Sequence, residues 1–202
     1  MRKFSGEIIL ASSSSRRREL LRELGLKFRI MVPEIDEGSE EFYPGLTQKL
    51  ASKKALAVAS RVAPGNLVIA ADTLVVQGRV IFGKPKDRDD ARRMLLELSG
   101  KKHEVFTGLC LLVSGTAECL SAEERTVVSF RTLSAAEIEA YLDTGEPFDK
   151  AGAYGIQGIG RLLVERVEGC FFNVVGLPIG RLNDFFQELG LNLLEMQSEG
   201  IY

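Results

Sequence analysis

The first residues that could do chemistry are four consecutive serines, Ser12–Ser15, followed by the arginines Arg16–Arg18. The apolar run Ile8–Ala11 before them predicts a buried strand, and a helix is expected from about Arg16 to Leu24. Free backbone N–H groups at a helix start favour an anion, and arginine side chains match phosphate oxygens. Cations at the positive end of a helix dipole are disfavoured, and a bound polyphosphate would resolve that conflict. A serine N-cap with solvated arginines explains the same pattern, so both interpretations stay open.

Two acidic positions could hold a divalent metal. Asp72 follows the apolar run Val68–Ala71 and is expected at the end of a strand, where catalytic groups of α/β proteins gather. There it could bind a metal or accept a proton from water, and an aspartate that caps a turn is the alternative. Glu37 belongs to the acidic segment Glu34–Glu41, which could bind Mg²⁺ or could be an acidic surface loop.

A pair of lysines lies in a helix that Thr47 is expected to cap and that runs to about Val62. With helical spacing, Lys54 falls within the apolar stripe of this helix, while Lys53 falls outside it. A lysine on the buried face needs a partner or must extend its ammonium group to solvent. Lys54 is therefore the candidate for a buried phosphate contact, and extension to solvent is the alternative.

The segment Gly78–Pro85 imitates a phosphate-binding P-loop. Pro85 stands where that motif requires a serine or threonine, and the surrounding pattern predicts a hairpin rather than a strand followed by a helix. We therefore reject a P-loop and keep Lys84 as a candidate cation.

A glycine-rich segment, Gly145–Gly160, carries a further candidate. Its glycines permit close backbone approach or positive φ angles. Gln157 lies among them, and its side-chain amide offers one donor and one acceptor, which suits the edge of a nucleobase. A plain glycine-rich loop would explain the same residues.

The composition excludes several kinds of site. His103 is the only histidine, so a histidine-rich metal site is impossible and any catalytic triad would have to use it. Carboxylate ligands point to a hard metal such as Mg²⁺ or Mn²⁺. No two of the three cysteines have C-x-x-C spacing, which favours a reducing cytoplasm. The net charge of -2 gives no general attraction to nucleic acid or membrane, and no apolar run reaches membrane-spanning length.

Predicted helices and strands are interleaved along the chain, but tight turns join several strand pairs, which favours a mixed sheet. We expect a single α/β domain over residues 1–202. Three further expected elements are a hairpin of Leu74–Gln77 with Val80–Phe82, a helix opened by the capping box Ser134–Glu137, and a strand at Phe171–Val175.

Four stretches occur in a fixed order, and together they resemble the Maf family, once called septum formation proteins. They are the serine-rich turn with Arg16 and Arg17, Ala70–Thr73, Gly83–Pro85, and Asp149–Gly158. The resemblance covers the chain from Ile8 to about Leu189. One position departs from the family pattern, because Ser15 stands where proline is usual, which loosens the turn without removing a chemical group.

The resemblance implies a fold related to inosine triphosphate pyrophosphatases, with a central long mixed sheet, two α/β lobes and a cleft between them. It also implies metal-dependent hydrolysis between the α and β phosphates of a nucleotide, with Mg²⁺ or Mn²⁺ held by carboxylates that include Asp72 and Glu37. The catalytic aspartate of the family falls on Asp72. Its other polar positions fall on Arg17, Glu37, Lys54, Lys84 and Gln157.

The segment Gly152–Gln157 is similar to the family branch that converts dTTP and UTP to the monophosphate and pyrophosphate. The specificity positions of that branch fall on Arg16, Thr73 and Gln157. A sister branch that prefers 7-methyl-GTP and a non-catalytic nucleotide-binding regulator of cell division are the alternatives. We expect a cytoplasmic enzyme whose partner is a small nucleotide rather than nucleic acid or membrane, and the resemblance implies a homodimer.

Overall fold

The computed structural model describes residues 6–36 and 41–198, so the predicted metal ligand Glu37 lies outside the described residues. The strands are β1 (Ile8–Ala11), β2 (Phe28–Ile30), β3 (Leu67–Gln77), β4 (Val80–Phe82), β5 (Lys102–Val113), β6 (Cys119–Phe130) and β7 (Val164–Glu168). The helices are α1 (Ser15–Glu23), α2 (Leu46–Ala59), α3 (Arg88–Leu98), α4 (Ala135–Asp143), α5 (Phe171–Val175), α6 (Ile179–Glu188) and α7 (Leu193–Ser198). Three short 3-10 helices are η1 (Glu146–Asp149), η2 (Ala151–Ala153) and η3 (Ile159–Leu163).

Within the described residues the strands form one seven-stranded sheet, in the order β2-β1-β3-β5-β6-β7 with β4 paired to β3. β1 runs parallel to β2 and to β3, while the remaining neighbours pair antiparallel. The predicted α/β class with a long mixed sheet is therefore confirmed. No helix in the described part of the chain is long and apolar enough to cross a membrane.

Asp72 lies in the middle of β3, so the prediction that it ends a strand was wrong. β3 and β5 pair without interruption from Leu67 to Val76, with Asp72 opposite Gly108. The long partner strand satisfies the backbone N–H and C=O groups on both sides of Asp72, so the strand continues past it. The predicted hairpin between β3 and β4 is confirmed, with Gln77 paired to Val80.

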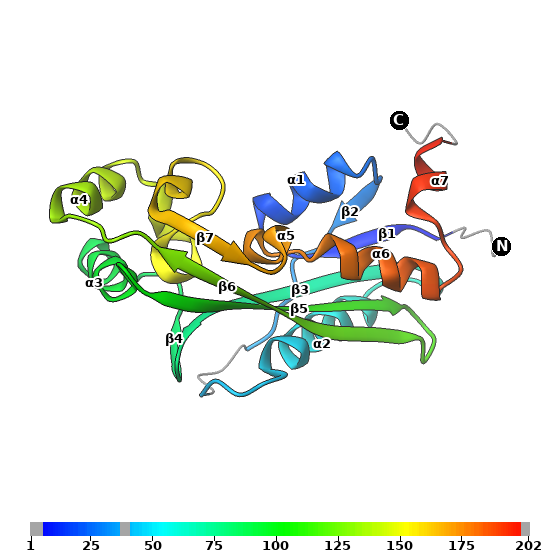
Figure 1. Cartoon of the computed structure of the whole chain (residues 1–202). Coiled ribbons are helices and arrows are strands. Elements are labelled where there is room, and N and C mark those ends of the chain that lie inside the picture. The colour runs from blue at the N-terminus through cyan, green and yellow to red at the C-terminus, as the bar shows by residue number, and fades with distance from the viewer. Residues whose placement is uncertain (1–5, 37–40, 199–202) are drawn as a thin grey trace.

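Helices cover both faces of the sheet. α2 lies on one face against β3 and β5, whereas α1, α5 and α6 lie on the other face, and α3 and α4 lie together at one end (Figure 1). Three buried apolar clusters match this arrangement. One packs α2 against the sheet, one packs α1 and α6 against the opposite face, and one joins α3 and α4 to the far end of the sheet.

The start of α2 differs from the prediction that Thr47 caps it. The N-cap residue is Gly45, and Thr47 lies inside the helix and is fully buried. The capping carboxylate comes instead from Glu123 on β6, which accepts hydrogen bonds from the backbone N–H of Gly45 at 2.9 Å and of Thr47 at 3.3 Å. Its Oε2 also accepts the Thr47 hydroxyl at 2.6 Å. A negative charge at the positive end of the helix stabilises it, and here a neighbouring strand supplies that charge.

The strand predicted at Phe171–Val175 is the helix α5, so that prediction was wrong. Aromatic and β-branched residues favour a strand locally. Gly176 follows with a left-handed backbone at φ 113°, and the N–H of Leu177 bonds to the carbonyl of Phe172 at 3.0 Å, which closes a helical turn. The buried amide of Asn173 also donates to the carbonyl of Val105 at 3.0 Å, which fixes α5 against β5.

Candidate active site

A cavity of about 1100 Å³ lies where α1, α2, β3 and the segment after β4 meet the loop of η1 and η2. Ligand pockets commonly measure roughly 300–1,000 Å³, so this one has room for a nucleotide. Seven of the predicted site residues line it, and they come from elements far apart in the sequence. They are Arg16, Arg17, Lys54, Asp72, Thr73, Lys84 and Gln157.

Lys54 and Asp72 form a buried ion pair in this cavity. Nζ of Lys54 lies 2.5 Å from Oδ1 of Asp72, and the two residues are 9% and 6% exposed. The neighbouring Lys53 is exposed, which confirms that Lys54 is the lysine on the inward face of α2. The pair holds the Asp72 carboxylate in a fixed position in the cavity lining, where it can face a bound ligand.

The serine-rich turn forms the start of α1 and lines the cavity. Ser14 is the N-cap, and its hydroxyl accepts a hydrogen bond from the N–H of Arg17 at 3.4 Å. The serine N-cap that the sequence left open is therefore present. The whole segment from Ser12 to Arg18 nevertheless lines the cavity, so a ligand bound there would lie beside it.

Arg17 ties three parts of the site together. Its Nε donates to the carbonyl of Gly176 at 2.8 Å, and one Nη donates to Thr73 Oγ1 at 2.9 Å. The other Nη donates to Ser12 Oγ at 3.2 Å. Thr73 Oγ1 also lies 3.0 Å from the hydroxyl of Thr107 on β5. Arg17 thus joins the serine-rich turn to β3 and to the turn after α5, and it fixes the serine-rich turn beside Thr73.

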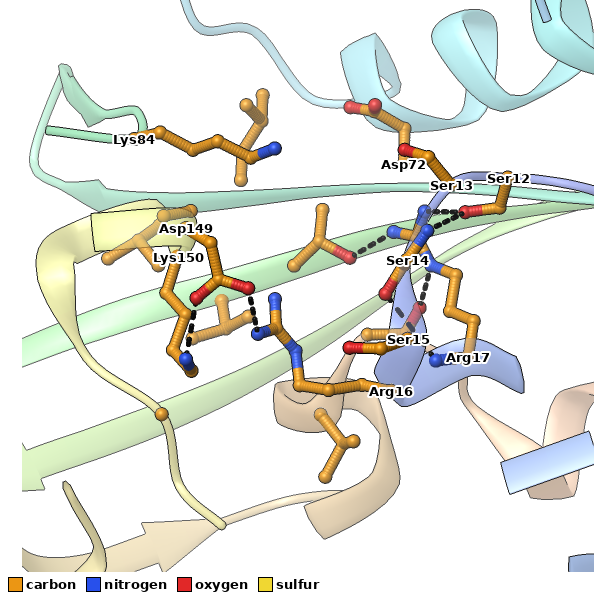
Figure 2. A pocket seen from close by; sticks show the side chains of 18 of the residues that line it. Ser12, Ser13, Ser14, Ser15, Arg16, Arg17, Asp72, Lys84, Asp149 and Lys150 are labelled. Atoms are coloured by element: carbon orange, nitrogen blue, oxygen red, sulfur yellow. Dashed lines mark hydrogen bonds and ion pairs between the residues drawn. The ribbon is translucent and has the colours of Figure 1, made fainter. Parts of the chain in front are cut away.

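Arg16 faces the part of the cavity wall that contains Asp149 and Lys150. Its guanidinium lies 3.6 Å from the carboxylate of Asp149, and Asp149 also bonds to Lys150 Nζ at 2.6 Å (Figure 2). Burial opposes ionisation of Asp149, but the neighbouring Lys150 and Arg16 charges outweigh that effect and lower the pKa of its carboxyl group. Lys84 points into the cavity from the segment after β4. Positive groups therefore enter the cavity from several sides.

Four further charged or aromatic residues that line the cavity were not selected as site residues from the sequence: Arg18, Asp149, Lys150 and Tyr154. Asp149 and Lys150 belong to the glycine-rich segment, where a carboxylate next to a lysine was the available signal. Arg18 follows the two arginines that were selected, and its Nε is buried without a hydrogen-bond partner among the described residues. A buried unpaired donor of this kind is satisfied when a ligand supplies an acceptor.

His103 is buried inside the protein and does not line the cavity. It is 1% exposed, and its Nε2 lies 2.8 Å from the hydroxyl of Tyr154. Its ring also packs edge-on against Phe130 and Tyr154. Since His103 is the only histidine of the chain, a serine or cysteine triad has no histidine available in this cavity.

The fold and the cavity define a class of protein: a mixed α/β protein with a cation-lined pocket around a buried carboxylate. The family model for Maf-like proteins matches residues 7–189. A protein named dTTP/UTP pyrophosphatase from Acetivibrio thermocellus is 51% identical over 197 residues, covering 94% of this chain and 98% of the relative. A protein of the same name from Desulforamulus reducens is 47% identical over 189 residues, covering 93% and 98%. The chain therefore belongs to the family of Maf-like proteins.

Among solved structures, the Ham1 protein of Staphylococcus aureus aligns with a TM-score of 0.47 at 13% sequence identity. That alignment covers 76% of this chain and 77% of the Ham1 chain. A likeness of this size is too small to bear on the site.

Proposed function

We propose that this protein hydrolyses dTTP and UTP to the nucleoside monophosphate and pyrophosphate. The observation that carries the proposal is the buried Asp72 carboxylate, held by Lys54 in a cavity that Arg16, Arg18 and Lys84 also line. Relatives that are 45% to 51% identical carry the name dTTP/UTP pyrophosphatase, which supports pyrimidine triphosphates as the substrates.

In this proposal, Asp72 orients or deprotonates the water that attacks the α phosphate. Lys54 and Lys84 reduce the negative charge that develops on the pyrophosphate leaving group, and Arg17 keeps the serine-rich turn in place for the phosphates. No covalent intermediate is required. The groups accelerate the reaction by their positions and their charges.

A divalent metal is part of the proposal. In the described ranges, 6–36 and 41–198, no group of three or more histidine, cysteine or acidic residues is arranged to hold a metal ion. Mg²⁺ commonly uses only one or two protein carboxylates and takes its other ligands from phosphates and water, so the Asp72 carboxylate in the cavity lining fits this mode. Asp72 and Glu37 would hold the ion, which would supply positive charge to the phosphate oxygens.

The proposed setting is the cytoplasm. The three cysteines are all free thiols, which suits a reducing compartment, and pyrimidine triphosphates are available there. A homodimer is also part of the proposal, and the mass of the protein in solution tests it.

The test of the proposed function is a panel of nucleoside triphosphates assayed for pyrophosphate release at substoichiometric protein, with and without EDTA. We expect steady release from dTTP and UTP, loss of activity with EDTA, and recovery with Mg²⁺ or Mn²⁺. A preference for 7-methyl-GTP would place the protein in the sister branch. Binding without turnover would make it a nucleotide-binding regulator. Full activity after exhaustive chelation would refute the metal requirement.

A further inference from the structure

Glu146, the first residue of η1, is surrounded by hydrogen-bond donors although it does not line the cavity. Its Oε1 accepts the hydroxyl of Tyr141 at 2.9 Å and the backbone N–H of Gly160 at 3.0 Å. Its Oε2 accepts the N–H of Ile159 at 2.8 Å. Burial opposes ionisation of Glu146, but these hydrogen bonds outweigh that effect and lower the pKa of its carboxyl group, so it is charged at neutral pH.

Tyr141 extends the same set of contacts to the other side of Gln157. Tyr141 is 3% exposed, and its hydroxyl accepts the N–H of Gly155 at 3.1 Å while it donates to Glu146. Backbone N–H groups before Gln157 and after it, at residues 155, 159 and 160, are therefore held by one tyrosine and one carboxylate. Gln157 lies on the short segment between these fixed points.

The glycines of this segment fit closely around the same two side chains. A Cβ atom at Gly158 would lie 2.4 Å from Oε2 of Glu146, and one at Gly160 would lie 2.6 Å from the hydroxyl of Tyr141. Gly158 also has φ +63°, a conformation that other residues rarely adopt. Gly158 and Gly160 are therefore needed for the backbone to pass close to Glu146 and Tyr141. The sequence predicted close backbone approach for the glycines of this segment.

Glu146 is also linked to the wall that faces Arg16. Lys150 Nζ donates to the backbone carbonyl of Glu146 at 2.6 Å and to Asp149 at 2.6 Å, and Asp149 pairs with Arg16. Arg16 and Gln157, the predicted specificity positions on this side of the cavity, are therefore both connected to Glu146, which does not line the cavity.

We propose that Glu146, together with Tyr141, is a positioning residue that sets the preference for the nucleobase by fixing the segment from Gly155 to Gly160 and the Gln157 side chain on it. This inference rests on the proposed function, in which Gln157 reads the base. Asp72, Lys54 and Lys84 lie on other elements, so the inference predicts an effect on base preference that is separate from the chemical step.

The test compares the binding of dTMP and dAMP, which carry the bases but have no anhydride bond to hydrolyse. In Glu146→Gln, one oxygen is replaced by an NH₂ group, so at least one of the N–H groups at residues 159 and 160 loses its acceptor. We expect the ratio of the dTMP and dAMP dissociation constants to move toward one by roughly five- to tenfold. With dTTP, we expect KM to rise while kcat changes less than about threefold, and amide exchange at Ile159 to accelerate.

The matched control is Glu137→Gln. Glu137 also accepts backbone and hydroxyl donors, from Ser134, but it caps α4 away from the cavity. Glu137→Gln should lower the free energy of unfolding and leave the ratio of the dTMP and dAMP dissociation constants unchanged. Tyr141→Phe gives the same test as Glu146→Gln if the latter does not fold.

An unchanged ratio in folded Glu146→Gln or Tyr141→Phe protein would overturn the inference, and so would wild-type protein that binds dTMP and dAMP equally. An equal fall of kcat for every nucleotide would overturn it as well, since that result indicates a general structural role. The proposed function fails on a different observation, the absence of pyrophosphate release by wild-type protein.

Discussion

Nζ of Lys54 on α2 lies 2.5 Å from Oδ1 of Asp72 on β3, and both residues are almost fully buried. Removing two charges from water is unfavourable, and a buried ion pair is often no more stable than an apolar pair of the same size. Stabilisation of the fold is therefore a poor explanation for this ion pair. Its place in the wall of the cavity agrees better with a carboxylate that is oriented to face a ligand.

Replacing Lys54 by alanine should damage the protein far more than replacing Lys53. Lys54→Ala leaves the Asp72 carboxylate buried without its ammonium partner, which should lower the free energy of unfolding by roughly 3 kcal/mol. It should also lower kcat/KM for dTTP by about 10²-fold. Lys53 is exposed, so Lys53→Ala should change stability by less than about 0.5 kcal/mol. Urea unfolding and pyrophosphate release measure both effects, and equally small changes in the two variants would contradict this role of Lys54.

Replacing Asp72 by asparagine should keep the fold and remove most of the activity. Asparagine has the same shape and can still accept a hydrogen bond from Lys54, but it has no charge and cannot take a proton from water. We expect kcat to fall by roughly 10²-fold or more. Asp184→Asn, which changes an exposed aspartate on α6, is the control and should retain full activity. Near-normal kcat in folded Asp72→Asn protein would exclude Asp72 as the catalytic group.

Local patterns in the sequence predicted those features of the fold that depend on neighbouring residues. The capping box was predicted from Ser134 and Glu137 alone, and both of its hydrogen bonds are present, at 3.2 Å and 2.8 Å. The inward position of Lys54 followed from the helical period. Four short stretches in a fixed order contain six of the predicted site residues that the structure brings to one cavity, and Lys54, which the helical period selected, also lines it.

The features that the sequence did not predict depend on partners far along the chain. Glu123 caps α2 from a position 78 residues after Gly45, and no local pattern at Thr47 indicates this. β3 continues through Asp72 because β5 pairs with it on both sides of that residue. Asp149 was missed as a member of the site because its partner Arg16 lies on α1, at the other end of the chain.

Gly108 on β5 should not tolerate a side chain. A Cβ atom there would lie 2.0 Å from the backbone oxygen of Thr47, so the start of α2 would have to move. We expect Gly108→Ala to lower the free energy of unfolding by about 3 kcal/mol, and to lower activity because α2 carries Lys54. Gly180→Ala is the control, since nothing lies within 4 Å of its added Cβ, and alanine in α6 should raise stability by about 0.5 kcal/mol. Equal unfolding midpoints in urea for the two variants would contradict this prediction.

The single histidine should make the protein less stable in mild acid. Burial lowers the pKa of His103 to about 4, from an ordinary value near 6.5. Between these values the unfolded chain binds a proton that the folded protein does not, so stability is complete above about pH 6.5 and falls as the pH drops toward 4. The loss attributable to His103 should reach about 3 kcal/mol near pH 4. Urea unfolding at several pH values measures it.

His103→Gln provides the comparison for this pH dependence. Glutamine does not titrate, so the difference in unfolding free energy between wild type and variant should shrink as the pH falls from 7 to 4. Carboxyl groups that titrate in the same range are shared by the two proteins and cancel in the difference. A difference that is constant with pH would show that His103 does not bind its proton in this way.

Base preference should depend on Gln157, which lines the cavity and is half-buried on the segment that Glu146 and Tyr141 hold. Its amide offers one donor and one acceptor, which complement the O4 and N3–H edge of thymine or uracil. A site that pairs with one base edge leaves its own polar groups unpaired against another edge, and this penalises the wrong base. Wild-type protein should therefore prefer dTTP and UTP to dATP and dGTP.

Gln157→Ala should reduce this preference more than it slows the best substrate, because in the proposed function the amide pairs with the base and not with the phosphates. The measurement is kcat/KM for each of the four nucleotides with both proteins, and Lys53→Ala serves as the control with an unaltered cavity. Equal hydrolysis of purine and pyrimidine triphosphates by wild type would contradict the assignment to the dTTP/UTP branch. Intact selectivity in Gln157→Ala would leave the family membership in place but transfer base reading to Arg16 or Thr73, the two other specificity positions in the same cavity. Variants of those two residues would then be assayed with the same four nucleotides.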